Sequence, residues 1–322
     1  GLGPPLPPLP PPPNTSSFES VQCSGEIVLI DVSTNVHTWT LPRPVARTRA
    51  FVTGTQAAAA AYVPARDAVA MSISESGTEV VFRTHRPVSP DEVLGGHQPP
   101  RVSVCVYELR AASAASVHHH STTMAADTQL FTVPISNPMA RRHNTFAIVT
   151  ATSNGTAFAA TDQLQAKVVS LGQIIMSSPP AVLLVQLARG TPSSSTTLGV
   201  ELQVVTIARA TVQHVSITPV FATAVLSGGG GPTPMRKRFA DREQLPAASV
   251  RPLSKSLLFV STKFANDTSV VAAGLLCTLR AEQAPNVADT IEVAVGVSGA
   301  SSAEVAAQVV TFEDSDNIFV EH

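Results

Sequence analysis

Residues 270–299 read VVAAGLLCTLRAEQAPNVADTIEVAVGVSG and carry the clearest structural signal in the chain. Two apolar runs rich in β-branched residues, 270–279 and 290–297, flank a polar link around Pro285. Such a pattern is typical of two β-strands joined by a connection. Along the second run the larger apolar residues alternate with small or polar ones, at Ile291, Val293, Val295 and Val297. Because successive side chains of a strand point to opposite faces, we predict a strand that buries one face only.

The rest of the chain has the same character, with short apolar runs separated by Gly, Pro, Asn and Ser. These runs predict two series of strands. The first series covers residues 25–32, 36–41, 49–53, 68–74, 78–84, 101–109, 129–135 and 145–152. The second series covers residues 165–176, 181–188, 199–208, 211–226, 255–262, 270–279, 290–297 and 305–312. We therefore predict an all-β protein, with one short helix signal at 57–61 and a long surface loop at 86–100.

The stretch 270–299 resembles the last two strands of the jelly-roll domains in coat proteins of picorna-like icosahedral viruses. It is most similar to the coat proteins of plant viruses that carry several jelly rolls per chain. In those coats an apolar strand, an Ala-Pro turn and a strand of the type DTIEVAVGVSG close the domain. The resemblance implies a structural capsid subunit located in the virion, which assembles with other copies of itself, either alone or with a second coat polypeptide.

The two series of strands suit two jelly-roll β-sandwich domains, each with two sheets that bury their inner faces. We predict a Pro-rich extended arm at residues 1–20, a first domain at 21–158 and a second domain at 159–322. A Gly- and Pro-rich long loop is expected at 227–250, inside the second domain. An alternative division ends a shell domain near residue 215, because the runs 182–187 and 199–205 also resemble a closing hairpin, and adds a smaller protruding module.

The composition favours a protein whose surface is largely covered by other proteins. Hydrophobic residues make up 44% of the 322 residues, yet aromatic residues are only 5% and charged residues 14%, against about 25% charged in an average soluble domain. The net charge of −2 provides few clustered cations to neutralise phosphates. We therefore expect the protein to contact packaged RNA weakly or indirectly. We expect neighbouring copies of the chain to cover its surface of small apolar residues.

Two groups of basic residues are the candidate nucleic-acid contacts. One is Arg236, Lys237 and Arg238, and the other is Arg43, Arg47 and Arg49. The Pro-rich start of the chain is the candidate inter-subunit arm, because consecutive prolines favour an extended polyproline II conformation. Its residues are Pro4, Pro5, Leu6, Pro7, Pro8, Leu9 and Pro10.

Three further groups of polar residues have plain structural interpretations. Cys23, Cys105 and Cys277 lie in or beside apolar runs, so we predict buried thiols rather than a disulfide. The run 118–120, three histidines, is predicted to lie in a solvated loop, with a metal site or a pH-responsive subunit contact as alternatives. Three carboxylates at 313, 314 and 316 are predicted to form a solvated acidic tail, with a calcium site as the alternative.

The sequence favours a structural protein over an enzyme. It contains no Gly-x-Ser-x-Gly elbow, no His-Glu-x-x-His and no Gly-rich phosphate loop, so we predict no enzymatic activity and no cofactor. We expect neither a signal peptide nor a transmembrane helix, and no membrane partner. The alternative function is a secreted or surface tandem β-sandwich that acts as a binding or adhesion module. Only two Tyr and one Trp are present for ligand stacking, which argues against it.

Overall fold

The computed structural model describes residues 17–56, 68–96, 99–153, 160–171, 182–190, 196–221, 235–238, 256–264, 275–280, 290–295 and 302–312. This part of the chain is all-β, as predicted, and its strands pair antiparallel in six sheets. The described residues contain no helix long and apolar enough to span a membrane. Residues 1–16 of the predicted arm, the helix signal at 57–61 and the acidic tail lie outside the described residues. Residues 18–20, also predicted as arm, instead begin the strand β1 (Phe18–Cys23).

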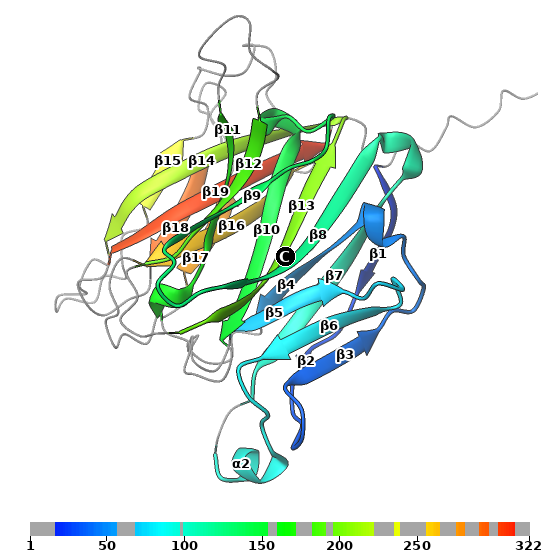
Figure 1. The fold of residues 1–322 in the computed structure, drawn as a ribbon, viewed down its shortest axis with the longest axis vertical. Helices are drawn as coiled ribbons and strands as arrows, with labels where there is room; N and C mark the ends of the chain where they lie inside the picture. Colours follow the sequence, from blue (N-terminus) through cyan, green and yellow to red (C-terminus); the bar gives the residue numbers. More distant parts are fainter. Residues whose placement is uncertain are drawn as a thin grey trace, which may run out of the picture.

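The strands follow one another in three sets, which Figure 1 shows in blue to cyan, in green, and in yellow to red. Set 1 contains β1 (Phe18–Cys23), β2 (Ile27–Val28), β3 (Val36–Thr40), β4 (Ala50–Gln56), β5 (Val69–Ile73), β6 (Glu79–Thr84) and β7 (Arg101–Leu109). Set 2 contains β8 (Ala115–Met124), β9 (Leu130–Pro134), β10 (Thr145–Ser153), β11 (Gln165–Leu171), β12 (Val182–Ala188) and β13 (Leu198–Ile207). Set 3 contains β14 (Ala210–Phe221), β15 (Met235–Arg238), β16 (Ser256–Phe264), β17 (Leu275–Arg280), β18 (Thr290–Val295) and β19 (Ser302–Phe312).

The three sets share one order of strand pairing. In set 2 the sheets are β8-β13-β10 and β9-β12-β11, and in set 3 they are β14-β19-β16 and β15-β18-β17. In set 1, β7 pairs with β4 and with the successive strands β1 and β2, while the second sheet is β3-β6-β5. In every set, therefore, the last strand (β7, β13 or β19) lies between the first and third long strands of that set. The strand before the last (β6, β12 or β18) lies between the two strands of the second sheet.

Alternating apolar residues build a separate core in each of the first two sets. The core of set 1 joins Val52 and Val104 of one sheet to Met71 and Phe82 of the other. The core of set 2 joins residues of its two sheets in the same way, among them Ala147, Leu202, Val168 and Val185. Burying such faces is the main source of stability for sheets that have one polar side.

Strand β13 is buried on both faces, although Glu201 and Gln203 alternate with Val200, Leu202 and Val204 in its sequence LGVELQVVTI. Leu202 and Val204 face the core of set 2, whereas Val205 and Ile207 belong to a second cluster that reaches sets 1 and 3. The sheet β8-β13-β10 therefore lies between its own partner sheet and a neighbouring set.

The strand pairing bears on several sequence predictions. The predicted boundary between residues 158 and 159 falls inside set 2, where it would separate β10 from its partner β13. The runs around β12 and β13 do not form a hairpin, because β12 pairs with β9 and β11 while β13 pairs with β8 and β10. Set 2 ends at Ile207, close to the alternative boundary near 215. The two strands predicted in 270–299 are confirmed as β17 and β18, which pair with each other, but they are not the last two strands of set 3, because β19 follows them.

Two predicted loops contain regular structure. Helix α2 (Pro90–Leu94) interrupts the loop predicted at 86–100. It begins at Ser89, whose hydroxyl accepts from the Glu92 amide at 3.2 Å, while the Glu92 carboxylate accepts from the Ser89 amide at 3.0 Å. Ser-Pro-x-Glu is the sequence signature of such a capping box. Strand β15 lies within the loop predicted at 227–250, whose other residues are outside the described part.

Candidate functional site: the contacts between strand sets

The register of the last strand in each set defines equivalent positions. Opposite the last strand, His119 pairs with Gln203 in set 2, and His214 pairs with Gln308 in set 3. The sequences that follow the two glutamines also agree, since residues 203–207 read QVVTI and residues 308–312 read QVVTF. The same pair of positions therefore carries the same two side chains in sets 2 and 3.

His119 binds the main chain of set 1. Its Nε2 lies 2.9 Å from the carbonyl oxygen of Arg47, the first residue of the 3-10 turn η1 (Arg47–Arg49), and 3.0 Å from that of Ala50, which follows the turn. Carbonyl oxygens only accept, so Nε2 carries the proton, and the buried Nδ1 has no hydrogen-bond partner. Burial lowers the pKa of His119. The ring is therefore held neutral, as a donor to the preceding set.

His214 repeats this arrangement one set later. Its Nε2 lies 2.7 Å from the carbonyl oxygen of Arg142, in the 3-10 turn η3 (Arg142–Asn144), and it also bonds to the backbone of Thr145. Burial lowers the pKa of His214 to about 4. Arg142 and Thr145 have the same spacing as the two residues that His119 contacts. Both histidines thus bind the turn that precedes the third long strand of the set before.

Each glutamine binds both polar groups of one main-chain residue. Gln203 Oε1 accepts from the Val52 amide at 2.8 Å, and its Nε2 donates to the Val52 carbonyl at 2.9 Å. Gln308 Oε1 accepts from the Ala147 amide at 2.9 Å, and its Nε2 donates to the Ala147 carbonyl at 2.8 Å. Both glutamine side chains are buried. A buried amide that satisfies a main-chain pair in this way replaces the missing neighbour strand.

A hydroxyl side chain completes each contact. Thr150 in β10 accepts from the Met71 amide at 2.9 Å and donates to the Met71 carbonyl at 3.4 Å. Ser261 in β16 accepts from the Ala166 amide at 2.9 Å and donates to the Ala166 carbonyl at 3.3 Å. The two hydroxyl residues occupy equivalent places along the third long strand of their sets, so all three elements of the contact are repeated.

These contacts cover sheet edges. Within the described residues, β4, β5, β10 and β11 each pair with a single strand, so each is an edge strand. Unpaired edges expose main-chain donors and acceptors that invite pairing with other chains, and proteins commonly cover them. Here the sheet face of set 2 covers the edges of set 1, and the sheet face of set 3 covers those of set 2. The arrangement binds protein main chain and holds three sandwich-like units in one body.

An aromatic cluster lies where the three sets meet. Phe51 of set 1 and Phe146 of set 2 have ring centroids 5.6 Å apart, and Phe146 stacks on Phe259 of set 3 at 4.6 Å. Phe18 of set 1 lies 4.9 Å from Phe312 of set 3. Leu109, Ile207 and Phe312, the last residues of β7, β13 and β19, belong to the same cluster. Equivalent residues of all three sets therefore converge on one core.

The candidate arginines of set 1 are bound within their own set. Arg43 and Arg49 lie 3.4 and 3.8 Å from the buried carboxylate of Glu108, and Arg47 Nε donates to the carbonyl of Ile73 at 3.1 Å. Glu108 also accepts from the Ala46 amide at 2.9 Å, so it anchors this loop to β7. Arg43 remains exposed. These arginines have structural roles in set 1, and their contact with RNA stays a prediction.

The other candidate residues lie in less described parts of the chain. Arg236, Lys237 and Arg238 form most of β15, which pairs with β18 in set 3, and their side chains are not described. The structure therefore places the two basic groups in different sets. The candidate arm, Pro4 to Pro10, lies outside the described residues.

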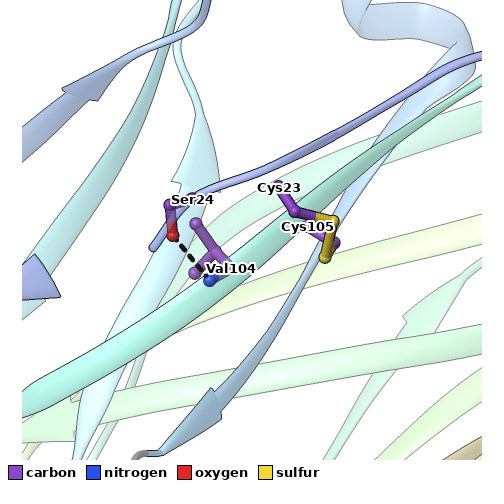
Figure 2. The surroundings of a disulfide bond; sticks show 4 residues. All are labelled: Cys23, Ser24, Val104 and Cys105. Atoms are coloured by element: carbon purple, nitrogen blue, oxygen red, sulfur yellow. Dashed lines mark hydrogen bonds between the residues drawn. A yellow bond between two sulfur atoms is a disulfide. The ribbon is translucent and has the colours of Figure 1, made fainter. Parts of the chain in front are cut away.

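Two cysteines form a disulfide, contrary to the predicted buried thiols. Cys23 of β1 and Cys105 of β7 lie directly opposite each other, with Cα atoms 4.1 Å apart. Figure 2 shows the bond beside Ser24, whose hydroxyl accepts from the Val104 amide at 3.0 Å. The prediction failed because the two residues are 82 positions apart in sequence, and only the strand pairing brings them together. Cys277 lies in β17, and its side chain is not described.

The three histidines at 118–120 lie in strand β8, contrary to the predicted solvated loop. His118 and His120 are exposed, and His119 points the other way, toward set 1. Within the described ranges no three His, Cys, Asp or Glu side chains gather as a metal site would require. Sequence reasoning noticed this run but had no signal for β8, because its residues ASVHHHSTTM are mostly polar.

Comparison with protein-family models, with curated proteins and with solved structures found no match for this chain.

Proposed function

We propose that this chain is a structural capsid subunit that self-assembles into an icosahedral virus shell around an RNA genome. The observation that carries the proposal is the order of strand pairing. In a jelly roll a long antiparallel ribbon is wrapped into two sheets, so the first strand pairs with the last and the second with the last but one. The three sets have this order, with β8 beside β13 and β9 beside β12 in set 2. The order supports three compact jelly rolls in one chain.

The packing of the sets supports a role in assembly. Edges of one set are covered by the sheet face of the next, through side chains that bind main chain rather than particular partner side chains. A contact of this kind is heterologous, since different surfaces of the two units meet, and such contacts extend into rings or larger arrays. In the proposed shell the Pro-rich arm lies along a neighbouring copy, and the two basic groups contact RNA weakly. A second coat polypeptide remains compatible with this assembly.

The test is the assembly state of the purified full chain. Size-exclusion chromatography and negative-stain electron microscopy should reveal round particles of uniform diameter, and the ratio of absorbance at two ultraviolet wavelengths should report any packaged nucleic acid. A monomer that persists across salt concentration, pH and added calcium would overturn the proposal.

One observation is also met by the second candidate, a secreted or surface binding module. The disulfide between Cys23 and Cys105 suits an oxidising environment, which secreted proteins, cell surfaces and virion surfaces share. Under this alternative the chain stays monomeric and binds a sugar or a protein. Retention of the monomer on a glycan or protein array, together with the absence of particles, would favour it over the capsid subunit.

A further inference from the structure

The outer face of the sheet formed by β1, β7 and β4 is exposed around Val21, whereas Phe51, opposite Tyr107 on the same face, is buried in the aromatic cluster. The equivalents of Val21 in sets 2 and 3 are covered. Val117 and Val212 occupy equivalent positions, opposite Val205 and Val310, and their exposed fractions are 5% and 4%. In set 1 the equivalent residue is Val21, opposite Tyr107, and its exposed fraction is 48%. The same kind of surface is therefore buried twice within the chain and exposed once.

The edge that could cover this face lies at the other end of the array. Val52 and Ala147, whose main chains are bound by the next set, lie opposite Val106 and Val204. The equivalent residue of set 3 is Leu258, opposite Val309 in the edge strand β16. Within the described residues β16 pairs only with β19, and β17 only with β18. Set 3 thus ends in the pair of edge strands that, in sets 1 and 2, is covered by a neighbouring sheet face.

We propose that the open face of set 1 binds the β16 and β17 edge of a second copy of this chain. The occupant follows from continuity with the two internal contacts. Among the described residues, the exposed region around Val21 and the β16 and β17 edge are the two unmatched halves of the same repeated contact. Joining them would extend the array from one copy to the next in a head-to-tail manner. The inference rests on the proposed self-assembly and names the surface through which it occurs.

The contact between copies differs from the internal contacts at one pair of positions. Where sets 2 and 3 carry His and Gln, set 1 carries the disulfide of Cys23 and Cys105, which cannot donate to a main-chain carbonyl. Thr55 retains the register of the hydroxyl residue, since it lies opposite Ser103 as Thr150 lies opposite Glu201. The contact between copies therefore relies on apolar burial around Val21 and is weaker than the internal contacts. A weak contact suits assembly, because misplaced copies can dissociate.

The first test introduces a charge on the open face. Val21→Arg should weaken association of the full chain at least about tenfold, since burying an unpaired guanidinium is costly. Val36→Arg is the matched control, because Val36 is 40% exposed on β3, in the other sheet of set 1. Circular dichroism and thermal unfolding confirm that both variants fold. Sedimentation velocity over a concentration series measures the association.

The second test restores the missing donors. Cys23→His combined with Cys105→Gln should strengthen association between copies about tenfold, whereas Cys23→Ser combined with Cys105→Ser should not. Equal association of wild-type, Val21→Arg and Val36→Arg proteins would overturn the open face as the docking surface while leaving self-assembly intact. A restored variant that becomes more compact without associating would show closure within one chain and would overturn the second copy as occupant. A wild-type protein that never associates would overturn the proposed function itself.

Discussion

The contact between sets 1 and 2 and the contact between sets 2 and 3 are built alike, whereas the open face of set 1 is built differently. His119 and Gln203 in one contact correspond to His214 and Gln308 in the other. At the open face the same positions hold Cys23 and Cys105. A half-buried His and a buried Gln satisfy main-chain groups where an edge strand approaches, whereas a disulfide occupies the same positions where no edge of the same chain approaches. This difference indicates that the His and Gln side chains stabilise the contacts between sets, and that they are not needed for an individual set to fold.

The largest effect is expected from removing a glutamine. Gln203→Leu leaves the amide and carbonyl of Val52 buried without partners, and we expect the free energy of unfolding to fall by about 2–5 kcal/mol. Gln308→Leu leaves the amide and carbonyl of Ala147 without partners, so it should lower the free energy of unfolding by about the same amount if the two contacts are equivalent. Urea unfolding measures both, with Gln186→Leu as the control, because Gln186 is half-buried in β12 within set 2. A loss of stability in only one of the two glutamine variants would show that the two contacts between sets are not equivalent.

Removing the disulfide should destabilise set 1 without disturbing the contacts between sets. We expect Cys23→Ser with Cys105→Ser to lower the free energy of unfolding by about 2–4 kcal/mol, the usual range for a native disulfide. Hydrogen exchange separates the two effects. Protection should fall in β1, while the amides of Val52 and Ala147, which the glutamines bind, keep theirs. Loss of protection at Ala147 would mean that the disulfide also supports the internal contacts.

Acid should weaken both internal contacts. The native pKa of His214 is lowered to about 4 and that of His119 is also lowered, both chiefly by burial, whereas an unfolded histidine titrates near about 6.5. Between these values the unfolded chain binds protons that the native chain does not, so the free energy of unfolding falls as pH falls from about 6.5 to about 4. His214 alone contributes at most about 3 kcal/mol. Urea unfolding from pH 7 to pH 4 measures the slope.

The histidine variants provide the control for this pH dependence. His119→Gln with His214→Gln retains a side-chain donor at each position but removes the titrating group, so the curve of stability against pH should flatten. His118→Gln with His120→Gln changes exposed histidines of the same strand and should leave the slope unchanged. An unchanged slope in the first pair would refute the role of the His119 and His214 rings.

The smallest effect is expected from the hydroxyl residues. Thr150→Val removes the partner of the Met71 main chain, and Ser261→Ala removes that of the Ala166 main chain. Each is expected to cost about 1–2 kcal/mol, because the two hydrogen bonds are only partly buried. Thermal unfolding followed by circular dichroism measures the loss. Thr132→Val in β9 is a matched control, since that strand belongs to the partner sheet of set 2.

The sequence predicted the all-β class and most strand positions, because alternating apolar residues are a local signal. Strands such as β7, β12 and β16 lie close to the predicted runs. Strand β8 was missed because its run of histidines and hydroxyl residues has no alternating apolar pattern. The division into sets depends on pairing between distant residues, which alternation does not encode.

One feature of the amino-acid sequence could have indicated the contacts between sets. The recurrence of QVVT at 203 and 308 marks two equivalent last strands, and a search for internal repeats would have found it. The roles of His119 and Thr150 had no such signal, because their partners are main-chain atoms of another set. The Cys23–Cys105 disulfide was equally hidden, since its two residues meet only through the ladder of β1 and β7.

The covering of one set by the next also has a direction along the chain, and this direction matters during translation. Strands β4 and β5 are complete long before Gln203 is made, because about a hundred residues separate the end of β7 from the end of β13. At a synthesis rate of about 5–20 residues per second, the edge strands of set 1 remain uncovered for roughly 5–20 seconds before β13 has been made. During that interval nascent chains on one polysome carry bare edges side by side. The chain is therefore expected to depend on chaperones most strongly while set 2 is being synthesised.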